Sequence, residues 1–91
     1  MVFAIHIQVF GAVQGVFFRA NTQAMASKLN LVGWVTNKKD GSVEILAEGS
    51  RSSLEKLLEW CYHGPENAHV KELEFAWVEP KNNSKEFSVI R

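Results

Sequence analysis

The fold of this 91-residue chain is decided by one stretch near its beginning, Gly11-Ala12-Val13-Gln14-Gly15-Val16-Phe17-Phe18-Arg19. Alternating apolar residues before it predict a strand over residues 2–10, and apolar residues at helical spacing after it predict a helix over residues 18–29. A tight turn from a strand into a helix gathers backbone N–H groups at the positive end of the helix. The stretch therefore predicts an anion site, at which the second glycine lets the backbone approach the ligand.

Arg19 closes this turn and gives the anion site a positive charge. A guanidinium presents a planar fork of donors that fits a phosphate. The alternative, a surface arginine or one in a structural ion pair, is less favoured because of the glycine turn before it. Gln14 is either a ligand contact or a loop residue that hydrogen-bonds its neighbours. The residues expected to bind a phosphate are Gln14, Gly15, Val16, Phe17, Phe18 and Arg19.

Alternating apolar residues predict four more strands, over residues 32–36, 42–47, 69–78 and 86–91. Asp40-Gly41 predicts the hairpin turn between the first two of them. With a second helix before the strand at 69, the order is strand, helix, strand, strand, helix, strand and a short extra C-terminal strand. This order predicts an α+β fold, a ferredoxin-like βαββαβ sandwich in which two helices cover one face of an antiparallel sheet.

The second helix is predicted by an apolar stripe at three- and four-residue spacing. The stripe consists of Leu54, Leu57, Leu58 and Cys61. Ser52 and Glu55 fit a capping box, in which each side chain satisfies a free N–H group at the start of the helix. A Gly-Pro pair at residues 64–65 is expected to end the helix.

Composition limits the classes of function. Ten basic and ten acidic side chains give a net charge of zero, which argues against nucleic acid or an anionic membrane as the partner. No apolar run approaches the roughly 20 residues that span a bilayer, and the first residues show no signal peptide. The single cysteine, Cys61, cannot form an intrachain disulfide and fits a reducing, cytoplasmic setting. We expect residues 1–91 to form one monomeric domain.

Two motifs give the chain a resemblance to a known family. Residues 11–19 resemble the acylphosphatase signature G-x-V-Q-G-V-x-F-R, and residues 33–44 resemble its second signature, G-W-V-x-N-x-x-D-G-x-V-E. A weaker third block matches at residues 64–70. Ala12 departs from the pattern, because many members carry a basic residue there, and its neutral side chain weakens the positive field near the loop. The resemblance covers nearly the whole chain and implies a ferredoxin-like acyl phosphate hydrolase.

Asn37 is the second candidate for a catalytic residue, together with Arg19. From its place just before an Asp-Gly turn, Asn37 is typical of a turn former. The resemblance instead places it beside the loop of residues 11–19. A carboxamide can accept from and donate to one water, and the resemblance implies that Asn37 holds this water in line with the phosphorus.

The remaining polar residues narrow the chemistry. His6, His63 and His69 show no metal-ligand spacing, and no paired carboxylates near the loop indicate a magnesium site, so we expect no metal and no cofactor. With no evident general acid, the pocket favours a leaving group that needs no proton, such as a carboxylate, whose acid has a pKa of about 4. We therefore expect acyl phosphates to be hydrolysed to carboxylate and inorganic phosphate by direct attack of water.

Two other functions fit the same fold. RNA-binding domains of this architecture stack bases on aromatic residues of the sheet, but the chain lacks an aromatic RNA-binding signature and a basic excess. A phosphate-loop domain could also have kept only a regulatory role. Hydrolysis of an aryl acyl phosphate in the presence of a chelator distinguishes all three.

Overall fold

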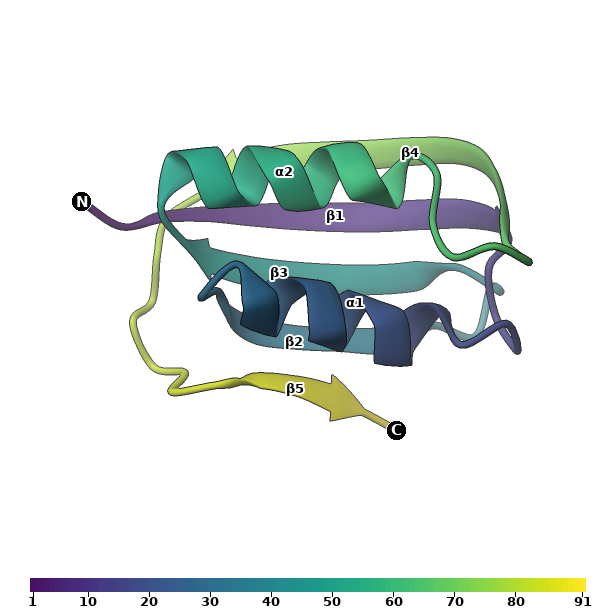
Figure 1. Ribbon diagram of the computed structural model, residues 1–91, viewed down its shortest axis with the longest axis horizontal. Helices are drawn as coiled ribbons and strands as arrows, with labels where there is room; N and C mark the ends of the chain where they lie inside the picture. Colours follow the sequence, from purple (N-terminus) through teal and green to yellow (C-terminus); the bar gives the residue numbers. More distant parts are fainter.

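The computed structural model describes residues 1–91 as a five-stranded sheet with two helices on one face (Figure 1). The elements are β1 (Phe3–Ala12), α1 (Phe18–Lys28), β2 (Val32–Asn37), β3 (Val43–Gly49), α2 (Arg51–Cys61), β4 (His69–Val78) and β5 (Phe87–Ile90). Their order confirms the ferredoxin-like α+β fold with a short additional strand at the end.

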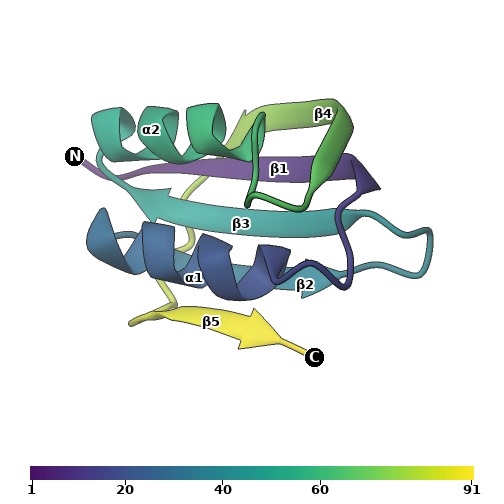
Figure 2. The same cartoon turned by 45° about the vertical axis from the view of Figure 1, so that its right-hand side comes forward.

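The strands lie in the order β4-β1-β3-β2-β5. The first four are antiparallel to their neighbours, whereas β5 runs parallel to β2, so the sheet is mixed. The chain reaches β5 by crossing from one edge of the sheet to the other, as Figure 2 shows. The buried carboxylate of Glu48 fixes this connection, because it accepts hydrogen bonds from the backbone N–H groups of Lys81 (2.9 Å) and Asn82 (3.1 Å).

The core lies between the sheet and the helices. Alternate residues of β1 and β3 point into it from paired positions, such as Ile7 opposite Ile45. From α1 the buried residues are Phe18, Thr22 and Ala26, and from α2 they are Leu54, Leu57 and Cys61. The apolar stripes expected from the sequence therefore face the sheet and fix how each helix is rotated about its axis.

The strand β1 continues two residues beyond the expected end at Phe10. Its pairing with β4 shifts register between Phe10 and Gly11, which is a β-bulge. Gly11 has φ 129°, and a Cβ there would lie 2.2 Å from the carbonyl oxygen of His69, so only glycine fits. The longer strand shortens the turn into α1 to residues 13–17.

The predicted start of α2 is wrong. The N-cap is Ser50, whose side chain accepts a hydrogen bond from the N–H of Ser53 (3.2 Å), and no capping box forms between Ser52 and Glu55. Glu55 instead lies 3.4 Å from Arg51 Nε in an exposed ion pair. The cause is the preceding strand: Gly49 is still paired in β3, so the chain turns directly after it.

Candidate functional site

The turn between β1 and α1 leaves a cluster of backbone N–H groups free. Gly15 has φ 76° and Phe17 has φ 62°, and α1 begins at Phe18 with no side chain capping its start. The N–H groups of Gly15, Val16 and Phe17 donate to no backbone carbonyl, and those in the first turn of a helix have no acceptor within it. Successive backbone N–H groups in a turn of this kind form a concave anion-binding nest.

Gly15 leaves room for a ligand at this nest. A Cβ built there would meet no protein atom within 4 Å, so the space beside the backbone is open. Its positive φ is a backbone conformation that residues other than glycine rarely adopt. The glycine therefore serves the shape of the turn and keeps the backbone accessible.

A pocket of about 440 Å³ opens beside the turn. It is lined by Val13, Gly15, Phe17, Phe18, Arg19, Ala20, Gln23, Asn37, Val89 and Arg91. These residues come from the turn, the start of α1, the end of β2 and the end of the chain, which lie together at one end of the molecule (Figure 2). The two predicted catalytic residues, Arg19 and Asn37, thus share one pocket.

The electrostatic character of the pocket is cationic. Arg19 forms no ion pair, and its only hydrogen bond is a long one from Nη1 to the carbonyl oxygen of Ile90 (3.4 Å). Arg91 also lines the pocket, and no carboxylate side chain does. Arg19 is half-buried as a residue, and its guanidinium carries an uncompensated charge near the free N–H groups, which suits an anionic ligand.

Asn37 is the last residue of β2 and lines the same pocket. Its Oδ1 is the one buried side-chain polar atom in the chain that lacks a hydrogen-bond partner. A buried acceptor without a partner costs about 1–3 kcal/mol. An unpaired carboxamide oxygen at a pocket is therefore a feature that a bound donor, such as a water, would satisfy.

Gln14 does not line the pocket. Its Nε2 donates to the carbonyl oxygens of Lys38 (2.8 Å) and Ser42 (3.0 Å), so the side chain ties the β1–α1 turn to the β2–β3 turn. Two roles were considered for Gln14, a ligand contact and a loop residue that hydrogen-bonds its neighbours. Its hydrogen bonds are those expected of the loop residue. Because Asn37 directly precedes the β2–β3 turn, this contact connects the β1–α1 turn to the segment that follows Asn37.

Ser42 holds the β2–β3 turn from the inside. Its hydroxyl accepts from Gln8 Nε2 (3.1 Å) and donates to Asp40 Oδ1 (2.6 Å), which also accepts from the Ser42 N–H (2.9 Å). These hydrogen bonds, with a smaller effect of Lys38, hold the pKa of the exposed Asp40 carboxyl below its ordinary value of 3.8. The turn beside Asn37 is thus supported by residues that never touch the pocket.

Two polar residues that line the pocket, Gln23 and Arg91, were not predicted from the sequence. Gln23 lines the pocket and donates from Nε2 to the carbonyl oxygen of Phe87 (3.0 Å), which fixes β5 to α1. Arg91 reaches the pocket because β5 pairs with β2, with Ile90 opposite Thr36. The sequence indicates the last strand but not the strand with which it pairs. The side chain of Val16 is partly buried and packs against the core.

The other residues considered for chemistry lie elsewhere. His6 contacts Glu44 (2.7 Å) on the sheet, and no three His, Cys, Asp or Glu residues gather as a metal-ligand cluster. Cys61 is fully buried, and this burial raises the pKa of its thiol far above the ordinary value. Neither helix has the length and apolar character that crossing a bilayer requires.

Comparisons with known proteins agree with the two motifs. A family model described as Acylphosphatase matches residues 5–89. An acylphosphatase of Roseiflexus sp. (strain RS-1) is 41% identical over 85 residues, which cover 93% of this chain and 91% of the relative. The structure of an acylphosphatase from Coxiella burnetii has a TM-score of 0.93 and 38% identity, covering 98% of this chain and 93% of that one. An acylphosphatase structure from Bacillus subtilis, 36% identical, has a TM-score of 0.93 over 100% of both chains.

Proposed function

Because the chain belongs to the acylphosphatase family and is an enzyme that hydrolyses acyl phosphates, we propose that the pocket between α1 and β2 is its active site. In this proposal the phosphoryl oxygens accept hydrogen bonds from the backbone N–H groups of residues 15–19 and from the guanidinium of Arg19. The free donors of the turn and the unpaired charge of Arg19 support it.

Asn37 takes the second catalytic role in this proposal. Its carboxamide holds a water against the phosphorus and accepts a hydrogen bond from it at Oδ1, the buried oxygen that no protein group donates to. The water oxygen bonds to phosphorus as the bond from phosphorus to the carboxylate oxygen breaks, and the electron pair leaves with the carboxylate. The proton of the water passes to the phosphate, so the products are a carboxylate and inorganic phosphate.

We propose that this reaction needs neither a metal ion nor a covalent intermediate. The polar groups of the pocket are backbone N–H donors, two arginines and two carboxamides, which bind anions and water rather than divalent cations. A carboxylate leaves without a proton from the enzyme, since its conjugate acid has a pKa of about 4. Donors preset for the developing charge are each worth roughly 10² to 10³ in rate.

The single observation that carries the proposal is the meeting of three unpaired features in one pocket. These are the open N–H cluster, the Arg19 guanidinium without an ion pair, and the buried Asn37 oxygen without a donor. Each feature alone destabilises the fold slightly or contributes nothing to it. Together they are complementary to a phosphoryl group with its attacking water.

The test is hydrolysis of benzoyl phosphate by the full chain in water enriched in ¹⁸O, with a chelator present. We expect turnover to persist with the chelator and the heavy oxygen to appear in phosphate rather than in benzoate. Acid quenching during turnover of ³²P-labelled substrate should leave no label on the protein. Turnover that requires added metal, label in benzoate, or a phosphorylated protein would each contradict the mechanism.

We also propose that residues 1–91 act as one monomeric unit in the cytoplasm, with a small acyl phosphate rather than a nucleic acid or a membrane as partner. The net charge of zero and the burial of the one thiol, which is free, support this proposal. Size-exclusion chromatography with light scattering, in the presence of phosphate, tests the oligomeric state.

A further inference from the structure

Phe17 combines two unfavourable features at the edge of the pocket. Its side chain is 78% exposed, and its backbone is left-handed, with φ 62° and ψ 24°. A bulky residue in this conformation is a genuine outlier, and glycine or asparagine would give the same turn with less strain. The N–H cluster needs the backbone shape but makes no use of a benzyl group, so the exposed ring calls for an explanation of its own.

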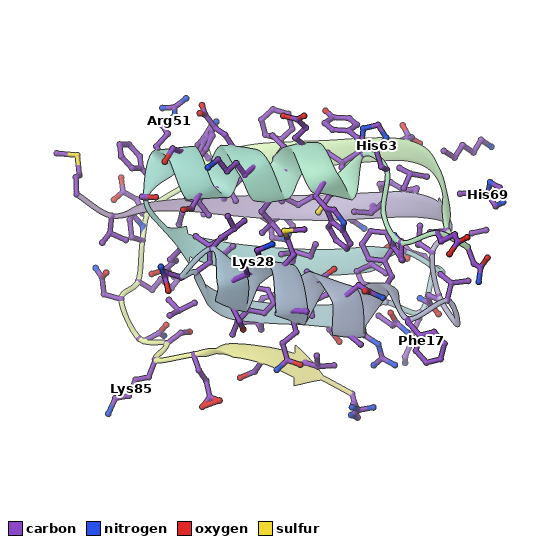
Figure 3. All side chains as sticks on the ribbon, viewed as in Figure 1. Phe17, Lys28, Arg51, His63, His69 and Lys85 are labelled. Carbon is purple, nitrogen blue, oxygen red and sulfur yellow. The ribbon has the colours of Figure 1, made fainter.

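The ring is displayed on a fixed backbone. The carbonyl oxygen of Phe17 accepts hydrogen bonds from the N–H of Asn21 (3.0 Å) and from its Nδ2 (2.9 Å). Figure 3 shows Phe17 projecting from the end of the molecule at which β1 leads into α1. The side chain of Phe17 does not pack against the core, whereas that of the preceding residue, Val16, does.

The pocket beside Phe17 is lined by both polar and apolar residues. Five of its ten lining residues are apolar, and they are Val13, Phe17, Phe18, Ala20 and Val89. A volume of about 440 Å³ lies within the range of pockets that enclose whole small molecules rather than a single phosphate. A phosphoryl group held by the N–H cluster and Arg19 leaves apolar lining residues available to the acyl group that it carries.

We propose that Phe17 is a specificity-determining residue that binds the acyl group, and that it favours flat aromatic acyl groups over short aliphatic ones. The inference rests on the proposed function, because it assigns the acyl side of the same pocket. An in-line displacement places the leaving group on the side of phosphorus opposite the water. Phe17 comes from the turn and Asn37 from the end of β2, so the two residues line the pocket from different elements.

The experiment compares kcat/KM for benzoyl phosphate and for acetyl phosphate. For Phe17→Ala we expect the benzoyl-to-acetyl ratio of kcat/KM to fall about tenfold, since stacking and apolar contact with the ring are lost. Phe17→Tyr keeps the ring and should keep the ratio. Phe17→Asn lacks the ring but suits the left-handed backbone, so it should show the same fall even if the alanine variant folds poorly.

The matched control is Phe75→Ala, which removes another exposed phenylalanine (44% exposed), on β4 and outside this pocket. It should leave the ratio as in the wild type. A ratio that is unchanged in both Phe17→Ala and Phe17→Asn, or that falls equally in Phe75→Ala, would overturn the inference. A wild-type chain that hydrolyses neither substrate would instead reject the proposed function, so the two failures are distinguishable.

Discussion

The two helices have the same length of 11 residues but begin in opposite ways. At α2 the N-cap Ser50 is extended, with φ −69° and ψ 149°, and its side chain accepts from the N–H of Ser53. At α1 the corresponding residue is Phe17, which is left-handed and caps nothing. The end that serves only the fold is closed by a side chain, whereas the end that faces the pocket keeps its donors free.

This difference has a cost that a ligand can offset. A serine cap is worth about 1 kcal/mol, and a left-handed residue other than glycine costs about 1–3 kcal/mol. The start of α1 lacks a side-chain cap and has a left-handed phenylalanine, so both differences lower the stability of the chain. An anion that binds only the folded chain stabilises it by mass action, so phosphate should raise the unfolding temperature. Binding is thus assigned to the start of α1, whereas a substitution at the start of α2 should affect stability alone.

The largest expected effect is that of Arg19→Ala. We expect kcat/KM for an acyl phosphate to fall on the order of 10³-fold, because a charged bidentate donor is lost together with its transition-state role. Competitive inhibition by inorganic phosphate should disappear as well. The matched control is Arg51→Ala, which removes an arginine from the start of α2 and should leave both quantities unchanged. Phosphate inhibition that survives in Arg19→Ala would contradict the assignment.

The second effect is that of a substitution at Asn37, the pocket residue at the end of β2. Asn37→Ala should lower kcat about 10²-fold while the inhibition constant of phosphate stays nearly normal, because the residue orders water and not the ligand. Asn83→Ala, an exposed asparagine in the β4–β5 connection, serves as the control. Loss of phosphate inhibition in Asn37→Ala would mean that the carboxamide binds the phosphoryl group directly.

The third effect is on stability alone. Ser50→Ala removes the cap of α2 and should lower the free energy of unfolding by about 1 kcal/mol. Urea unfolding measures this loss, and steady-state kinetics on the same sample should show an unchanged kcat/KM. A Ser50→Ala variant with a loss of activity as large as its loss of stability would show that the two helix starts are not independent.

The elements of the fold were predictable because their periodicity is local. The stripes of α1 and α2 and the strand β4 (His69–Val78) follow from apolar spacing and lie where the sequence indicates. The cap of α2 was mispredicted because three serines, at positions 50, 52 and 53, all suit a helix start. The end of β3 decides between them, and that end depends on the pairing of Gly49 with Phe3 in another strand.

Site residues that stand in a sequence motif could be predicted. Site residues that reach the pocket only through strand pairing could not. Arg19 and Asn37 each stand in a motif, and the structure brings them into one pocket. Arg91 reaches the pocket only because a four-residue strand pairs with β2, and so short a strand carries no signal for its partner. The role of Gln14 was open because its acceptors are backbone carbonyls, which every residue possesses.

The smallest effect tests how α1 is positioned without a local cap. The β1–α1 turn is tied through Gln14 to the β2–β3 turn, which Asp40 holds through Ser42. The pKa of Asp40 is lower in the folded chain than its ordinary value of 3.8, so its contribution to stability is complete above that value and is lost as the pH falls through the lowered pKa. Asp40→Asn resembles the protonated form at every pH.

Urea midpoints of the wild type and Asp40→Asn should therefore differ most at neutral pH, with the wild type the more stable. The difference should disappear at the acid end, below the lowered pKa, where both side chains are neutral. Ser50→Ala provides the contrast, because its cap carries no charge and its deficit should persist at both ends of the range. A deficit of Asp40→Asn that is independent of pH would assign the effect to side-chain geometry and not to the carboxylate charge.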